Sequence, residues 1–325
     1  MADRSRTAEP AAPGAGAAGV GRVSTHRAAG SPFGGLRRHL IGWAFALPFV
    51  VIFAIFLAGP IAASMALSLT DFGLRDLRNP LGTNFVGLDN YTALLSDEKF
   101  RKALFNTAYF VIVGVPLTLV LGLAAALALD RGIRRFRVLF RVGYYLPVVT
   151  SIVAIAVVWR FLLNPDQGLL NMLLAAVGFE GPNWLANPTL AMPSIIVMAA
   201  WRNLGFAMII FLAGLQTIPA QLYEAASIDG AGRWQAFRHV TLPLLRPTVL
   251  FLVVLTTIGY LQLFEEPFVM TDGGPLDQTL SISMYMFQQG FEFFRQGYAA
   301  AIAWILFILV AIVAVVQFRL LRSEA

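Results

Sequence analysis

The chain has 325 residues, of which 58% are hydrophobic and 13% are charged, and its mean hydropathy is +0.71. A soluble domain carries about 25% charged residues, so this composition excludes an ordinary water-facing protein. The chain has no cysteine, which excludes disulfides, cysteine nucleophiles and cysteine-ligated metals. Its three histidines are isolated in the sequence, and no metal site is expected. The net charge of +6 would suit nucleic acid, but the placement of the charges favours membrane topology and no nucleic-acid partner.

Residues 1–38 are rich in Ala, Gly, Pro and Arg and contain almost no large apolar side chains. Such a segment cannot bury enough apolar surface to offset the entropy of ordering it, so we expect a disordered tail. A targeting or regulatory arm is the alternative interpretation, and no cleavable signal peptide is expected. We expect residues 39–325 to form one transmembrane domain, with its core at 104–320.

Six apolar runs follow, close to the ~20 residues that cross a bilayer. The fifth run is the shortest, and the second contains a proline, which a membrane helix tolerates. The composition therefore predicts an all-α integral membrane protein with six transmembrane helices. The runs are Leu40–Leu67, Tyr109–Leu129, Val142–Phe161, Pro193–Leu215, Thr248–Phe264 and Ala299–Phe318.

The distribution of Lys and Arg predicts the orientation of these runs. With alternate connections assigned to opposite sides, one side carries sixteen Lys and Arg residues and the other carries six. Positive charge gathers on the cytoplasmic side. Both termini and the connection at 219–247 are therefore expected in the cytoplasm, and the connections at 70–108, 164–192 and 265–297 on the outer side.

The connection at 219–247 is a polar, helix-compatible segment between two apolar runs. Ala225 and Ala226 would let a partner approach closely, and Gly230 permits a turn. Trp234 and Phe237 are three residues apart and would form an apolar face. The pattern indicates a short helix–turn–helix on the cytoplasmic face, and a plain interfacial helix is the alternative.

The string EAASIDGAGRWQAFRHVTLP, at 224–243, resembles the EAA signature of permease subunits in binding-protein-dependent ABC importers, in the form carried by the carbohydrate-uptake branch. Further matches are GLDNY at 87–91, WRFLLNPDQGLLN at 159–171, AGLQTIPAQLYEAA at 213–226 and TDGGP at 271–275. One departure is Val240, where the family usually has Ile.

The resemblance implies a permease fold in which 219–247 is a coupling segment that docks into a cytoplasmic ATPase. The only lysines, Lys99 and Lys102, do not lie in a GK[ST] context, so the chain has no P-loop and is not expected to be an enzyme. ATP and magnesium would bind to the partner ATPase, and this chain would hold no cofactor. The expected coupling residues are Glu224, Ala225, Ala226, Asp229, Gly230, Trp234, Phe237, Leu242 and Pro243.

The implied assembly contains a second permease, two ATPase copies and an extracytoplasmic solute-binding protein, in contact with lipid in a bacterial cytoplasmic (inner) membrane. The implied cargo is a sugar or oligosaccharide. A glycerol-phosphate-type solute stays open, because an arginine lies inside the fourth run. A secondary transporter coupled to an ion gradient is the other alternative, although the six runs contain no Asp or Glu.

Polar residues inside membrane spans are costly and are therefore candidates for a solute pathway. Arg202 and Asn203 offer hydrogen-bond donors and Phe206 a ring face, which suits the hydroxyls and C–H faces of a sugar. The alternative is that Arg202 snorkels, or pairs with Glu265 or Glu266. The resemblance places the lining on the fourth and fifth runs. The candidates are Arg202, Asn203, Phe206, Tyr260, Gln262 and Leu263.

Overall fold

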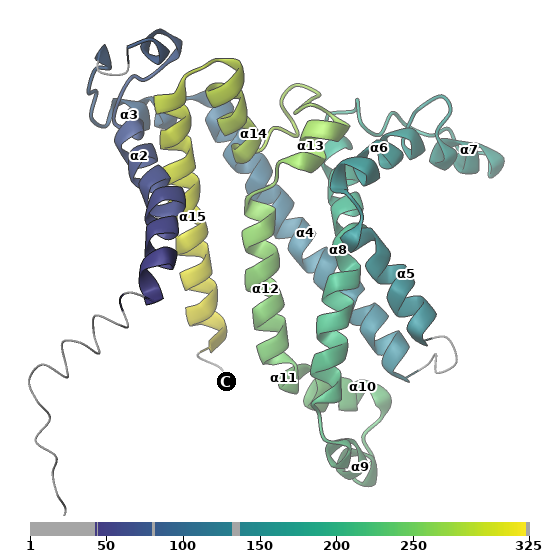
Figure 1. Cartoon of the computed structure of the whole chain (residues 1–325). Helices are drawn as coiled ribbons and strands as arrows, with labels where there is room; N and C mark the ends of the chain where they lie inside the picture. Colours follow the sequence, from purple (N-terminus) through teal and green to yellow (C-terminus); the bar gives the residue numbers. More distant parts are fainter. Residues whose placement is uncertain (1–42, 44, 80–81, 132–136, 323–325) are drawn as a thin grey trace, which may run out of the picture. The chain divides into compact units, whose positions relative to one another are not determined.

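The computed structural model describes residue 43 and residues 45–79, 82–131 and 137–322. The predicted tail at 1–38, the start of the first run and the arginines at 134 and 135 lie outside the described residues. The chain divides into two units, 1–58 and 59–325. In the first unit, residues 45–53 are α-helical and Ala54–Ala58 form one turn of π-helix. The second unit contains every other element (Figure 1).

Four helices are long and apolar enough to cross a membrane: Phe45–Ser68, Glu98–Asp130, Ala191–Gln216 and Gln296–Leu320. They correspond to the first, second, fourth and sixth predicted runs. The three that lie wholly in the second unit belong to α4 (Glu98–Arg131), α8 (Ala191–Gln216) and α15 (Gln296–Arg322). Pro116 lies inside α4 without ending it. The chain is thus a multi-pass helical membrane protein.

The third predicted run is not one straight helix. Its residues form α5 (Arg137–Val149) and α6 (Ile152–Leu162), which meet at 100°. Pro147 removes an amide donor near the end of α5, and the hydroxyl of Thr150 donates to the Leu146 carbonyl at 2.8 Å. Ser151 then leaves the helical region, with φ −54° and ψ 127°. Hydropathy detects the apolar run but not this break, because local hydrogen bonding decides it.

The fifth predicted run is also shorter than expected. Its helix, α12, covers Arg246–Leu261 and meets the preceding helical residues at 64°. The predicted end at Phe264 is wrong, because Phe264 adopts non-helical angles and a separate helix, α13 (Glu265–Met270), starts after it. The described residues therefore provide four spans, or up to six if each bent pair counts as one.

Glycines allow the central helices to pack closely. A Cβ at Gly122 of α4 would lie 2.6 Å from the Cβ of Ala207 on α8, and one at Gly205 of α8 would lie 1.9 Å from the Tyr144 carbonyl oxygen on α5. Membrane helices gain little from hydrophobic burial against lipid, so close contact between small residues supplies much of their packing.

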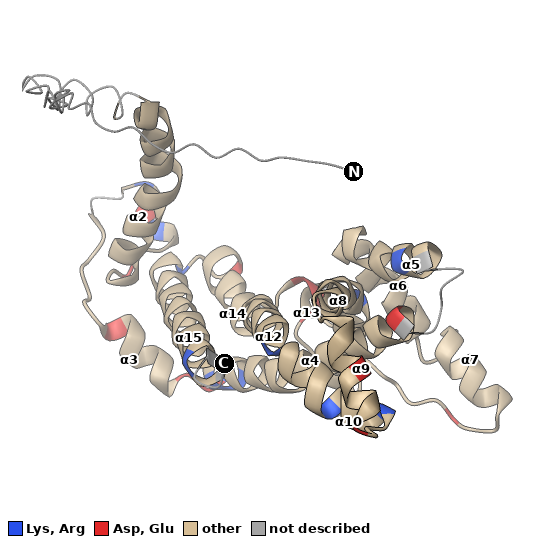
Figure 2. Cartoon of the chain, turned by 90° about the horizontal axis from the view of Figure 1, so that it is seen from below, with Lys and Arg blue, Asp and Glu red and all other residues tan. Residues whose placement is uncertain are grey.

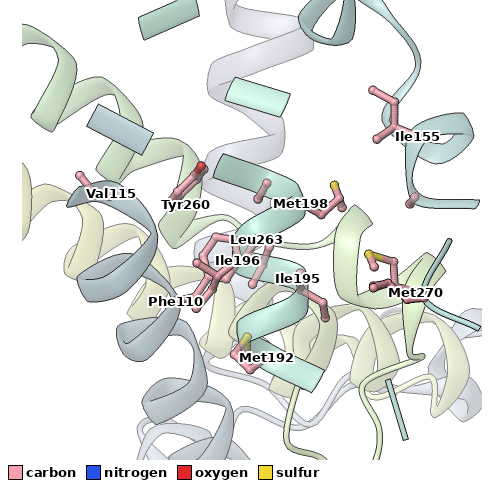
Figure 3. Close-up of a cluster of buried hydrophobic side chains, with 13 residues drawn as sticks. Phe110, Val115, Ile155, Met192, Ile195, Ile196, Met198, Tyr260, Leu263 and Met270 are labelled. Carbon is pink, nitrogen blue, oxygen red and sulfur yellow. The ribbon is translucent and has the colours of Figure 1, made fainter. Parts of the chain in front are cut away.

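Among the described residues of the second unit, two of the three buried clusters join its central helices. One joins α4, α8 and α12 through Phe110, Ile196 and Tyr260, and Figure 3 shows these side chains converging. The other joins the remaining halves of the same helices through Leu129, Phe211 and Leu252. The core thus runs along most of the length of α8 and holds its polar residues in place.

Short helices lie at the ends of the long ones. Figure 1 shows α13 and α14 at one end of α12, and α9 and α10 at the other. Figure 2, viewed from the latter end, shows helices that carry few charged residues. The short elements not yet given are α2 (Gly59–Ser68), η2 (Leu74–Leu77), α3 (Asp89–Ser96), α7 (Leu169–Ala176), α9 (Ala220–Ile228), α10 (Arg233–Ala236), η4 (Phe237–Thr241), α11 (Leu242–Leu244), α14 (Ile282–Phe287) and η5 (Gln288–Glu292).

Candidate functional site

The segment at 219–247 folds into two helical arms joined by a glycine turn. The first arm, α9, ends at Ile228, and Gly230 follows with φ +79°. The amide of Ala231 donates to the Ala226 carbonyl at 2.8 Å, which closes a Schellman-type cap. Only glycine adopts this φ without strain. The predicted turn at Gly230 is therefore confirmed.

The second arm begins at α10 and continues through η4 and α11 into α12. The hydroxyls of Tyr223 and Thr241 lie 2.9 Å apart and join the two arms. Thr241 is fully buried, so this contact fixes the first arm to a buried position of the second arm. The rings of Trp234 and Phe237 stack with centroids 5.4 Å apart, as their spacing predicted.

Most of the predicted coupling residues face outward. Trp234 is 69% exposed, and Ile228, which the sequence reading did not select, is 86% exposed. Glu224, Ala225 and Asp229 are also exposed. Among the described residues, this segment therefore presents apolar and acidic groups together on a surface that the rest of the chain does not cover. The remaining candidates are half-buried (Ala226, Phe237, Pro243) or exposed (Gly230, Leu242).

A second group of predicted site residues lies around the C-terminal end of α12. All six predicted pathway residues line one cavity of about 340 Å³. Arg202, Asn203 and Phe206 come from α8, and the others come from the end of α12 and the residues after it. The structure thus brings together candidates that are nearly sixty positions apart in sequence. The cavity is completed by Ile152, Ala207, Leu255, Thr256, Gly259, Glu265 and Glu266.

Hydrogen bonds fix the polar wall of the cavity. The hydroxyls of Tyr260 and Thr118 lie 2.7 Å apart, and the Asn203 amide donates to the Ala199 carbonyl at 2.9 Å and to the Tyr260 hydroxyl at 3.4 Å. A guanidinium nitrogen of Arg202 lies 3.5 Å from the Asn203 side-chain oxygen. The Nε of Arg202 is buried without a hydrogen-bond partner among the described residues, so the guanidinium is not fully paired within this chain.

Two further residues were not among the predicted pathway residues: Thr118, which contacts Tyr260 from behind the lining, and Glu266, which lines the cavity. Thr118 lies on α4, and nothing in its sequence context distinguishes it from other threonines in apolar runs. Glu266 is only 7% exposed, and burial raises the pKa of its carboxyl above the ordinary value. Among the described residues, no ion pair joins Arg202 to Glu265 or Glu266. In the sequence, the feature that could have identified Glu266 was the pair of acidic residues directly after the fifth apolar run.

The connections that are predicted to lie on the outer side contain a hydrogen-bonded clip centred on Asp97. One carboxylate oxygen accepts from the amides of Lys99 and Phe100 at the start of α4, and the other accepts from the hydroxyls of Tyr285 and Tyr298. Burial by itself would raise the pKa of Asp97, but these hydrogen bonds outweigh it and hold the pKa below its usual value. The clip ties α4 to α14 and α15.

Comparisons with known proteins give a consistent family. The sequence profile described as "Binding-protein-dependent transport system inner membrane component" matches residues 93–323. The chain is 37% identical over 286 residues to "Probable ABC transporter permease protein YesP" of Bacillus subtilis, covering 86% of this chain and 90% of that protein. It is 36% identical to "Lactose transport system permease protein LacF" of Rhizobium radiobacter, covering 87% and 94%.

A third relative is "Trehalose/maltose transport system permease protein MalF" of Thermococcus litoralis, 34% identical over 88% of this chain and 95% of that protein. A solved bacterial ABC transporter involved in import of the acidic polysaccharide alginate superposes with a TM-score of 0.74 at 26% identity, covering 90% of this chain and 98% of its own. These likenesses extend across both the cavity and the segment at 219–247. The chain therefore belongs to the inner-membrane components of binding-protein-dependent transport systems, the permease subunits of ABC importers, and is a transport component rather than an enzyme.

Proposed function

We propose that this permease carries a sugar or oligosaccharide across a bacterial cytoplasmic membrane, in six spans with both termini in the cytoplasm. The observation that carries the proposal is the cavity in which Arg202, Asn203, Phe206 and Tyr260 meet. It combines hydrogen-bonding groups with a ring face, a combination that suits polyhydroxylated solutes. The names of the lactose and trehalose/maltose relatives support a carbohydrate cargo.

The partners follow from the family and from the exposed segment. We infer that a second permease completes the pathway and that an extracytoplasmic binding protein delivers the solute. A related alginate transporter was solved with a periplasmic protein carrying an alginate pentasaccharide, which supports this arrangement. Two copies of a cytoplasmic ATPase would supply the energy.

The segment at 219–247 is the proposed attachment site for the ATPase. Glu224 is exposed and can pair with basic or amide donors, and the exposed Ala225 lets a partner approach closely. The exposed Trp234 ring offers an apolar anchor. Closure of the ATPases would move this segment and shift the helices between inward-facing and outward-facing states.

Purification in detergent tests this function. The chain is co-expressed with a candidate second permease, ATPase and binding protein from the same organism, and the purified complex is reconstituted in liposomes. We expect the ATPase to co-elute with this chain, and Glu224→Arg to abolish co-elution. Glu180→Arg, an exposed carboxylate in the connection between α7 and α8, is the matched control and leaves co-elution intact.

One outcome would overturn the proposal in favour of another transporter class. Solute uptake by this chain alone, driven by a proton or sodium gradient, would identify an ion-coupled secondary transporter. A glycerol-phosphate-type cargo is the second candidate, and the half-buried Arg202, whose Nε has no hydrogen-bond partner among the described residues, is the observation that favours it. A thermal-shift screen of the cognate binding protein against neutral and phosphorylated sugars separates these two cargo classes.

A further inference from the structure

The cavity contains more acidic than basic groups. Arg202 is its only cationic lining residue in the part of the chain that the structure describes, whereas Glu265 and Glu266 both contribute carboxyl groups. With both carboxyls ionised the lining carries one net negative charge, and with one protonated it is neutral. In neither state does the lining carry net positive charge.

Burial strengthens the effect of the Arg202 and Glu266 charges on a solute in the cavity. Glu266 is almost fully enclosed and the Nε of Arg202 is inaccessible to solvent, so water screens these two charges less than it screens the charge of Glu265, which lines the cavity but is exposed. A carboxylate or phosphate entering the cavity would approach Arg202 but would also approach two acidic side chains. With both carboxyls ionised the repulsion outweighs the attraction, and the anion also loses its hydration.

Uncharged hydroxyls avoid this conflict. Arg202 can donate to a sugar oxygen, and an ionised carboxylate at Glu266 can accept from a sugar hydroxyl. The amide of Gln262 also lines the cavity and offers both a donor and an acceptor. Leu255 and Phe206 supply apolar surface for the C–H faces of the rings. The lining therefore fits a solute with many neutral hydroxyls better than one with a fixed negative charge.

We propose that Glu265 and Glu266 are charge-selecting residues of the pathway, which offset Arg202 so that the cavity accepts uncharged sugars and rejects sugar phosphates and uronates. This inference rests on the proposed function, because it assigns the charge class of the solute that the same cavity accepts. It decides between the two cargo classes considered above in favour of the neutral one.

The natural lack of cysteine makes the charge of the cavity measurable. Gly259 lines the cavity, and a Cβ at this position would meet nothing within 4 Å, so Gly259→Cys places a thiol in open space. The assembled complex is treated with cationic methanethiosulfonate ethyltrimethylammonium or anionic methanethiosulfonate ethylsulfonate. Mass spectrometry of this subunit gives the labelling rates, each divided by the rate of the same reagent with free 2-mercaptoethanol. Thr256→Cys, three residues away on α12, is a second reporter.

We expect the normalised cationic rate to exceed the anionic rate by at least about threefold. Adding Glu265→Gln and Glu266→Gln together should remove or reverse this preference, and Arg202→Gln should increase it. Glu180→Gln, an exposed carboxyl outside the cavity lining, should leave it unchanged. A faster anionic rate at both reporters, or a preference unaffected by the double glutamine variant, would overturn the proposal.

Uptake by the reconstituted complex separates this inference from the proposed function. ATP-driven uptake of maltose or lactose, without uptake of glucose 6-phosphate, would support both. Uptake of glucose 6-phosphate at a rate equal to the neutral sugar would overturn the charge selection and leave the permease function standing. A cationic labelling preference in a complex that moves no sugar with ATP would refute the proposed function and leave the charge assignment intact.

Discussion

The cavity and the segment at 219–247 are held in opposite ways. In the cavity, Asn203, Tyr260 and Thr118 are linked side chain to side chain and packed between α4, α8 and α12. In the segment, the backbone turn at Gly230 and the Tyr223–Thr241 contact hold side chains that are largely exposed. A solute site gains selectivity from fixed geometry, whereas a surface that docks a separate protein must remain uncovered until the partner arrives.

The largest expected effect lies in the exposed segment. Glu224→Lys should lower ATP-dependent uptake at least about tenfold, because a reversed charge at a docking surface costs several kcal/mol of binding. Membrane insertion should be unchanged, since Glu224 is exposed and supports no buried contact. Uptake in proteoliposomes and the yield of membrane-extracted protein measure the two effects, with Glu180→Lys as control. Normal uptake by Glu224→Lys would contradict the coupling assignment.

A substitution in the buried contact between α8 and α5 should lower the stability of the fold. Gly205→Ala forces α8 and α5 apart, because the new Cβ would lie 1.9 Å from the Tyr144 carbonyl oxygen, and overpacking of this kind costs about 1–3 kcal/mol. The thermal unfolding temperature of the purified subunit in detergent should fall by several degrees.

Gly143→Ala is the matched control for this comparison. Gly143 also lies in a helix, α5, but a Cβ there would meet nothing within 4 Å. The unfolding temperature should remain the same or rise slightly, because alanine favours the helix more than glycine does. Equal losses in both variants would show that the contact between α8 and α5 does not limit stability.

An intermediate effect is expected at Arg202. Arg202→Ala should weaken the apparent affinity for the solute by roughly tenfold, because a hydrogen bond to a charged group contributes about 1.5–3 kcal/mol. Assembly with the ATPase should persist, since Arg202 is not part of the segment at 219–247. Solute-stimulated ATP hydrolysis, measured against solute concentration, tests this. Unchanged stimulation and affinity would make Arg202 a purely structural residue.

The smallest effect concerns the outer clip. The pKa of Asp97 is lowered in the fold, so its contribution to stability is present above the unfolded value of about 4 and is lost as the pH falls through the folded value. Asp97→Asn should therefore lower the unfolding temperature at pH 7, and the difference from the wild type should shrink below about pH 4. Asp166→Asn, an exposed carboxylate, is the control. A difference that stays constant down to pH 3 would contradict this linkage.

The two regions differed in how well the sequence predicted them. The EAA string marks the segment at 219–247 because its glycine, small residues and aromatic pair act locally, and the turn at Gly230 follows directly. The six pathway candidates were also identified, and the structure places all of them in one cavity. The hydrogen bond between Thr118 and Tyr260 and the place of Glu266 in the cavity lining were not predicted, because both depend on neighbours on other helices.

Composition, hydropathy and one local motif thus determined the class of this protein, its apolar runs and its family resemblance, since a span needs only enough consecutive apolar residues. Tertiary structure alone decided that the third run bends by 100°, that α12 stops at Leu261, and that Glu265 and Glu266 share a cavity with Arg202. These features depend on hydrogen bonds at a single break and on packing between distant helices. Neither leaves a periodic signal in the chain.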